Sequence, residues 1–88
     1  MKTIVVGSLE SSDCLITLTP ASETTIDIES VVYDAFGDQI RAVIEAVLSR
    51  HHLDDVHIRC QDKGALDYAI EARLETAIRR YKEANHGS

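Results

Sequence analysis

This sequence is poor in the residues that build most binding and catalytic sites. Among its 88 residues there is no Trp, one Pro, two Cys and four Gly, and the aromatic residues are three Tyr and one Phe. The glycines are scattered, so they form no glycine-rich loop that could hold a phosphate group. With so few aromatic side chains, the core has to be built mostly from Ile, Val, Leu and Ala.

Basic residues are also scarce. Nine Lys and Arg stand against fifteen Asp and Glu, which gives a formal net charge of −6. Binding to nucleic acid or to an anionic membrane requires a basic face, so this balance argues against both kinds of partner. An acidic chain is instead attracted to basic docking patches on other proteins.

Long apolar runs are missing as well. No segment approaches the ~18 apolar residues of a membrane-spanning helix, and the first six residues become polar too soon for a signal peptide. We therefore expect a cytoplasmic protein. Cys14 and Cys60 lack metal-type spacing, so no metal site is expected. We interpret both as reduced core residues, with a disulfide or a reactive thiol as the alternative.

Three segments in the first third are predicted to form strands; the first is short and β-branched, and the other two alternate in the manner of half-buried strands. They cover residues 3–6, 14–19 and 25–31. Pro20 ends the second segment, because proline has no N–H for a strand ladder. The polar segments between them, residues 7–13 and 21–24, are predicted to form hairpin loops.

The periodicity then becomes helical, and apolar residues recur three and four positions apart from Phe36 to Leu48. This helix is expected to end near His51 and His52. Residues 56–61 alternate again, and the turn that follows contains Gly64, which adopts positive φ at little cost. A second helix is predicted over residues 65–84, before a frayed tail at 85–88. Its apolar face consists of Leu66, Ile70, Leu74, Ala77, Ile78 and Tyr81.

The order βββαβα predicts the α+β class. Four strands with one apolar face and two amphipathic helices form a two-layer α/β sandwich, with both helices on one face of the sheet. The length is that of a single domain, which would span residues 1–88.

No cluster of titratable residues predicts a catalytic or a metal site. His51 and His52 are expected to complement the dipole at a helix end, His57 points outward and His86 lies in the tail. The second helix has an outward face that is either a docking site or a solvated surface. That face comprises Glu71, Arg73, Glu75, Arg79 and Lys82.

Two adjacent hydroxyls lie between two carboxylates in Glu10-Ser11-Ser12-Asp13, at the tip of the first predicted hairpin. One interpretation is an ordinary polar turn, because Ser and Asp side chains bond to nearby backbone. The other is a modification site, since an exposed serine on a turn is accessible to an enzyme that attaches a cofactor. No base lies beside Ser11 in the sequence, so that enzyme would have to supply one.

Three segments resemble the citrate lyase acyl carrier proteins, which form the gamma chain of that enzyme. Residues 7–13 resemble the family's Gly-Thr-Leu-Glu-Ser-(Ser/Gly)-Asp segment, residues 36–41 the start of its first helix, and residues 62–67 its turn into the last helix. The segments occur in the same order and at compatible spacing. Ser8 replaces the usual Thr, and Tyr68 stands where the family often has Cys.

The resemblance implies a carrier without catalytic activity of its own. The family's modified serine falls on Ser11, where a prosthetic-group transferase attaches 2′-(5″-phosphoribosyl)-3′-dephospho-CoA through a phosphodiester. The thiol of this arm holds acetyl as a thioester. The alpha subunit exchanges acetyl for citrate, and the beta subunit cleaves the citryl thioester to oxaloacetate and restores the acetyl form.

The family accepts Ser or Gly at Ser12, which favours Ser11 as the attachment site. Glu10, Ser12 and Asp13 are either recognition residues for the transferase or plain turn residues. Alternative functions are the carrier of a citramalate lyase or malonate decarboxylase, a small α/β interaction module without a cofactor, and a small-molecule-binding enzyme domain.

Overall fold

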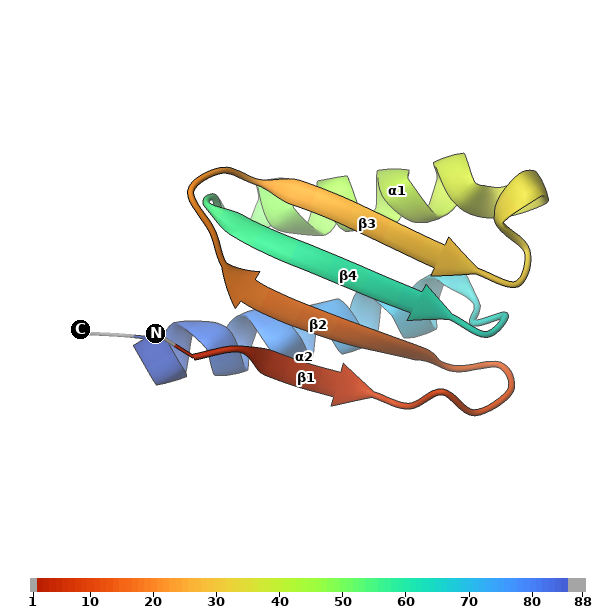
Figure 1. Cartoon of the computed structure of the whole chain (residues 1–88), viewed down its shortest axis with the longest axis horizontal. Coiled ribbons are helices and arrows are strands. Elements are labelled where there is room, and N and C mark those ends of the chain that lie inside the picture. Colours follow the sequence, from red (N-terminus) through yellow and green to blue (C-terminus); the bar gives the residue numbers. More distant parts are fainter. Residues whose placement is uncertain (1, 86–88) are drawn as a thin grey trace.

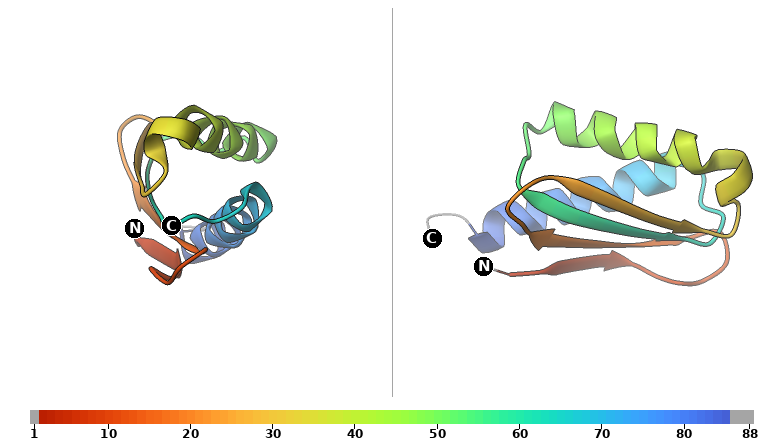
Figure 2. Two further views of the ribbon diagram at one scale, coloured as in Figure 1. Left: turned by 90° about the vertical axis from the view of Figure 1, so that its right-hand side faces the viewer. Right: turned by 45° about the horizontal axis from the view of Figure 1, so that its top comes forward.

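The computed structural model describes residues 2–85 as a four-stranded sheet covered on one face by two helices (Figure 1) (Figure 2). The predicted α+β class and the order βββαβα are confirmed. None of the helices in the described residues is long and apolar enough to cross a membrane. In chain order the elements are β1 (Ile4–Gly7), β2 (Cys14–Pro20), β3 (Thr25–Ser30), α1 (Tyr33–Arg50), β4 (Val56–Asp62) and α2 (Asp67–Asn85).

Strand directions bring three connecting segments to one end of the molecule. The strands are ordered β1-β2-β4-β3, with β2 antiparallel to both β1 and β4, and β3 parallel to β4. Strands β1, β3 and β4 therefore point the same way, and the chain leaves each of them at the same end of the sheet. That end, on the right of Figure 1, holds the β1–β2 loop and the starts of both helices.

The prediction of a hairpin loop at residues 21–24 is wrong, because β4 lies between β2 and β3. The connection crosses the start of β4 instead. There the N–H of Ala21 donates to the carbonyl of Asp55 (2.9 Å), and the N–H of Asp55 donates to the hydroxyl of Thr24 (3.0 Å). A short polar segment looks the same in sequence whether it forms a hairpin loop or crosses a neighbouring strand. Which of the two forms depends on where β4, a later strand, inserts into the sheet.

One face of the sheet and the facing sides of both helices form the core. Helix α1 packs against β3, and α2 packs against β1 and β2. The alternation predicted for β2 and β4 is confirmed, because every second residue of each is buried. The buried apolar residues are Val6, Cys14, Ile16, Leu18, Ile40, Ile44, Val47, Leu48, Val56, Ile58, Cys60, Ile70, Leu74, Ala77, Ile78 and Tyr81.

Both cysteines belong to this core, as predicted. Cys14 and Cys60 are free and fully buried on the paired strands β2 and β4. Hydrogen bonding with Cys14 and burial both raise the pKa of the Cys60 thiol, so it stays protonated at neutral pH.

Two residues assigned to the apolar helix faces are not part of the core. Phe36 is 49% exposed and Leu66 is 62% exposed. Phe36 lies in the first turn of α1, which projects past the ends of the strands in Figure 1, and Leu66 immediately precedes α2. Helical periodicity identifies the apolar side of a helix, but it does not show how far the sheet beneath it extends.

Asp62 is a buried carboxylate that the sequence analysis placed in a turn. It ends β4, and the residue is only 1% exposed. Its Oδ2 accepts a hydrogen bond from the Ser30 hydroxyl (2.7 Å), and its Oδ1 accepts one from the N–H of Ala65 (2.9 Å). Asp62 therefore links the end of β3 to the turn that leads into α2, where Gly64 adopts the predicted positive φ (+93°).

The C-terminal end of α2 extends to a residue that the sequence analysis assigned to the tail. Asn85 is the last residue of α2, and its side-chain oxygen accepts a hydrogen bond from the N–H of Lys2 (2.9 Å). The rest of the expected frayed tail, residues 86–88, lies outside the described residues. That the chain forms a single domain over residues 1–88 stays a prediction.

A matched pair of leucine substitutions tests this division between core and surface. Leu74→Ala should lower the free energy of unfolding by about 2–5 kcal/mol, because Leu74 is fully buried and the change leaves a cavity. Leu66→Ala should change it by less than about 0.5 kcal/mol, as an exposed site does. Urea denaturation followed by circular dichroism measures both, and equal losses would contradict the assignment of Leu66 to the surface.

Candidate functional site

The β1–β2 loop, residues 8–13, carries the serine pair that the sequence analysis singled out. Gly7 adopts φ +106° at the exit from β1, and a Cβ there would lie 2.0 Å from the carbonyl oxygen of Cys14. This close approach lets the N–H of Ser8 donate to that same carbonyl at 3.1 Å. Gly7 is therefore the residue that allows the loop to close tightly over the start of β2.

Backbone hydrogen bonds hold the loop against the turn that follows β4. The N–H of Ser12 donates to the carbonyl of Lys63 (2.9 Å), and the N–H of Lys63 donates to the carbonyl of Asp13 (2.9 Å). Within the loop, the N–H of Asp13 donates to the carbonyl of Glu10 (3.1 Å). The pairing of β2 with β4 thus continues past the strand ends, and Ser11 lies on a supported turn.

The carboxylate of Asp13 is the centre of the site. Its oxygens accept hydrogen bonds from the Ser8 hydroxyl (2.6 Å), the Cys14 N–H (2.7 Å) and two nitrogens of Arg73, Nε (3.1 Å) and Nη2 (2.8 Å). Hydrogen bonding from Arg73, followed by that from Ser8 and Cys14, lowers the pKa of Asp13 to about 2. This two-pronged contact of a guanidinium with a carboxylate has defined geometry, so it fixes the loop to α2.

Arg73 was expected on an outward face of the second helix, used either for docking or only for solvation. The structure directs its guanidinium to the loop instead, 60 residues away in sequence. No signal in the local sequence marks this contact, because an Arg at a polar position of an amphipathic helix is ordinary. Only the packing of α2 across β1 and β2 brings the two charges together.

The two serines differ in conformation and contacts. Ser11 is exposed, and in the described part of the chain its hydroxyl has no hydrogen-bond partner. Ser12 has φ +65°, a conformation that a glycine adopts more easily, and its N–H is bound to Lys63. Glu10 is exposed and contributes its backbone to the turn. Both hydroxyls are exposed and have no hydrogen-bond partner in the described part of the chain, so the two serines differ in backbone conformation and backbone bonding rather than in access.

A depression of about 460 Å³ separates the loop from the first half of α2. Ser11 borders it on the loop side, and Tyr68, Arg73 and Thr76 border it on the helix side. The side chain of Arg73 is 43% exposed, so its positive charge reaches this depression while it stays paired with Asp13.

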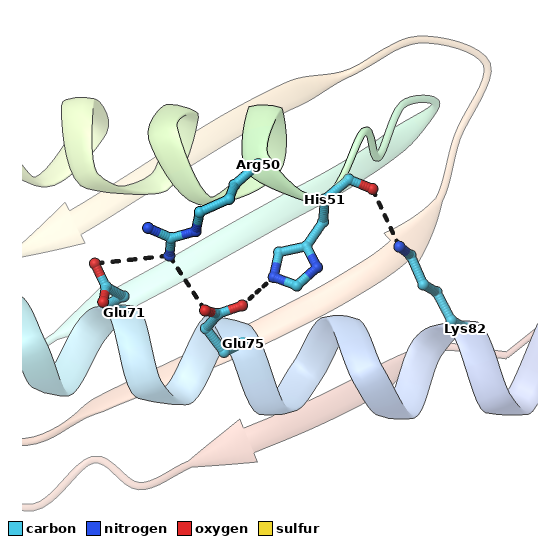
Figure 3. Close-up of polar contacts among 5 residues, drawn as sticks. All are labelled: Arg50, His51, Glu71, Glu75 and Lys82. Atoms are coloured by element: carbon cyan, nitrogen blue, oxygen red, sulfur yellow. Dashed lines mark hydrogen bonds and ion pairs between the residues drawn. The ribbon is translucent and has the colours of Figure 1, made fainter.

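Three other residues of the outward helix face, Glu71, Glu75 and Lys82, hold α1 and α2 together (Figure 3). Arg50 lies 3.2 Å from Glu75 and 3.8 Å from Glu71, and the His51 side chain also bonds to Glu75. Lys82 donates to the carbonyl of His51 (3.1 Å). The hydrogen bond between the His51 ring and the Glu75 carboxylate lowers the pKa of Glu75. The cluster consists of ion pairs and hydrogen bonds between the two helices.

The histidines in the described residues do not gather at one site. His51 lies at the C-terminal end of α1, as predicted, and His57 bonds to the hydroxyl of Thr25 (2.7 Å). His86 lies outside the described residues. Among residues 2–85, no group of three or more His, Cys, Asp or Glu side chains could hold a metal ion.

Comparison with known proteins gives three concordant findings. Residues 1–81 match the family described as "Malonate decarboxylase delta subunit (MdcD)". The chain is 49% identical to the citrate lyase acyl carrier protein of Streptococcus uberis over 91% of this chain and 80% of the relative. It is 40% identical to that of Treponema denticola over 90% of this chain and 91% of the relative.

A solved structure shares the fold. It is a crystal structure of a Pseudomonas malonate decarboxylase hetero-tetramer in complex with malonate, and one of its chains superposes with a TM-score of 0.79 at 20% identity. The match covers 89% of this chain and 81% of that chain. At this identity the likeness shows the arrangement of strands and helices alone.

Alanine substitutions at Gly7 and Gly64 separate two costs of replacing a glycine: collision of the added Cβ with nearby backbone, and strain from positive φ. Gly64→Ala should lower the free energy of unfolding by about 1–3 kcal/mol, because its φ is positive but nothing lies within 4 Å of the added Cβ. Gly7→Ala should lower it by more, since it adds a collision with the Cys14 carbonyl to the same strain. Chemical denaturation of both variants measures the difference, and equal losses would show that the loop does not need the close approach.

The Asp13 carboxylate should make stability depend on pH at the acid end. Its pKa is about 2 in the folded chain and about 3.9 when unfolded, so its contribution is present above about pH 4 and is lost as the pH falls towards 2. The gap in unfolding free energy between wild type and Asp13→Asn should therefore close over this range. The control Asp27→Asn, at an exposed site, should show a small constant difference. A gap that persists at pH 2 would rule out this carboxylate as the cause.

Proposed function

Because this chain belongs to the citrate lyase acyl carrier protein family, we propose that it is the carrier subunit of a citrate lyase and that Ser11 carries its covalent arm. The observation that supports the choice of residue is that Ser11, unlike Ser12, joins a free, exposed hydroxyl to a backbone without positive φ, on a loop held from two sides. The Asp13–Arg73 contact fixes the loop to α2, and Ser12 and Lys63 fix it to the turn after β4.

Ser12 is the weaker candidate for attachment. Its φ is positive, and its described contact is the backbone bond to Lys63, which does not involve its side chain. A glycine in its place would relieve strain and keep that bond, so the turn itself requires no side chain at this position. The hydrogen bonds of Asp13 and Ser8 assign both residues to support of the loop. Glu10, which is exposed beside Ser11, remains available for recognition by a transferase.

The residues around Ser11 fit a phosphodiester-linked arm. The proposed group, 2′-(5″-phosphoribosyl)-3′-dephospho-CoA, supplies a long chain whose terminal thiol holds an acyl group as a thioester. On the protein side, Ser11 provides the oxygen of the ester, and Arg73 offers a positive charge in the same depression. No base contacts Ser11 within residues 2–85, so the transferase has to remove its proton.

In this proposal the chain performs no chemistry on the acyl group. It presents the arm to the alpha and beta subunits, which exchange and cleave the citryl thioester, and tethering keeps the thioester at high effective concentration near both active sites. Two free buried thiols suit a reducing compartment, so we place the complex in the cytoplasm.

A malonate decarboxylase carrier is the second candidate, favoured by the matched family description and by the shared fold. Sequence identity favours citrate lyase, because the citrate lyase carriers reach 40–49% over most of the chain and the decarboxylase chain reaches 20%. The partner subunits select the acyl group, so assays with each set of partners separate these candidates and a citramalate lyase.

Intact-mass measurement tests the proposal directly. The chain expressed with the prosthetic-group synthase and transferase of a citrate lyase operon should gain the mass of the phosphoribosyl dephospho-CoA group. Ser11→Ala should abolish the gain, whereas the control Ser12→Gly should keep it, because glycine suits the positive φ at that position.

Two outcomes would contradict the proposal. A mass gain that survives Ser11→Ala but not a Ser12 substitution would move the attachment site. No gain under conditions that fully modify a citrate lyase carrier of known sequence would leave the interaction module without a cofactor as the better function.

A further inference from the structure

Exposed apolar side chains gather at the end of the molecule that carries Ser11. Seven large apolar side chains are exposed in residues 2–85, and six of them lie in three segments, residues 8–13, 31–36 and 63–68. The seventh, Val5, lies within β1. The six are Leu9, Val31, Tyr33, Phe36, Leu66 and Tyr68, and each is between 47% and 72% exposed.

The sheet topology brings these three segments together. They follow β1, β3 and β4, which run in the same direction and finish at the same end of the sheet (Figure 1). In the register, Cys14 and Ser30 both lie opposite Asp62, so the β1–β2 loop and the starts of α1 and α2 share this end. An exposed apolar surface of this kind marks a site of protein interaction in a folded chain.

A preformed groove lies at this end, between the starts of the two helices. It has a volume of about 380 Å³, and its apolar walls include Phe36, Ile40, Ala65 and Leu66. The Gln39 amide donates to the Asp67 carboxylate (2.7 Å) across the two helices, which holds the walls in place. The groove can therefore accept an apolar side chain without rearrangement of the fold.

The position of Tyr33 is also defined by packing. Its ring lies over Gly37 one helical turn away, so close that a Cβ at Gly37 would come within 2.9 Å of the ring. Gly37 thus allows an aromatic side chain to lie against the helix while 47% of that residue stays exposed. An ordered aromatic group adds contact area at low entropic cost when a partner binds.

Charge at this end is negative. Glu10, Asp34, Asp38 and Asp67 are exposed, and the positive charge of Arg73 is paired with Asp13. Lys63, in the turn after β4, is a basic residue of this end, where the four exposed carboxylates outnumber it. Most of the other basic residues are distant from this end, at the N-terminus and in the C-terminal parts of the helices: Lys2, Arg50, Arg79, Arg80 and Lys82. The apolar groove therefore has an acidic rim.

We propose that this end is the docking surface for the transferase that attaches the arm at Ser11, and that its contact combines an apolar side chain in the Phe36–Leu66 groove with basic residues on the acidic rim. The inference rests on the proposed function. Charge decides among the possible occupants, because two copies of this acidic end repel each other and an anionic membrane would be repelled as well.

Binding to the purified transferase of a citrate lyase operon tests the surface apart from the chemistry. All chains carry Ser11→Ala, so that no modification follows binding. Phe36→Ser and Leu66→Ser should each weaken the Kd about tenfold, as loss of an anchor at an interface does. Leu66→Ser leaves folding intact, because only the backbone carbonyl of Leu66 bonds to α2 and serine suits the start of a helix.

Matched controls identify the contribution of each part. Val5→Ser removes the exposed apolar residue that lies outside the surface, and it should change the Kd less than twofold. Asp34→Asn with Asp38→Asn should weaken binding and reduce its salt dependence, whereas Asp27→Asn with Glu83→Gln should change neither. The thermal midpoint of each variant verifies that it is folded.

The outcomes separate the docking surface from the proposed function. No binding, or equal Kd values for Phe36→Ser, Leu66→Ser and Val5→Ser, would overturn the docking surface. So would self-association that Leu66→Ser abolishes, since a second copy would then occupy the groove. Specific weakening of transferase binding by the groove variants, with no mass gain in the chain that retains Ser11, would support the docking surface and reject the carrier role.

Discussion

The contact between the Asp13 carboxylate and Arg73 is the interaction on which the candidate site depends. One side chain accepts hydrogen bonds from the start of its own loop, from the start of β2 and from α2. Arg73 keeps the carboxylate charged far below neutral pH, so these bonds persist under physiological conditions. Together with the backbone hydrogen bonds to Lys63, this contact gives Ser11 a defined position.

The parallel pairing of β3 with β4 has equal importance for the rest of the molecule. Because β4 lies between β2 and β3, three chain segments leave the sheet at one end, and all the features assigned to function collect there. The buried Asp62 stabilises this end by joining Ser30 to the turn before α2. Away from this end, Arg50, His51, Glu75 and Lys82 join the two helices.

The gathering of these features at one end suits a protein that enzymes handle. A carrier has to present a residue for attachment on a rigid base, and it needs a surface that its partners recognise without hindering the arm. The supported loop supplies the base, and the apolar groove with its acidic rim lies at the same end of the sheet. Neither feature requires a catalytic group on this chain.

The sequence by itself determined the order of the elements, their apolar faces and the buried state of both cysteines, because alternation and helical spacing report directly which side of each element meets the core. Its resemblance to a known family also directed attention to Ser11. Only the tertiary structure decided that residues 21–24 form no hairpin, that Phe36 and Leu66 are exposed, that Asp62 is buried and that Arg73 meets Asp13. Each of these depends on which strands pair and where the sheet ends, and such long-range relations leave no mark in the local periodicity of a chain.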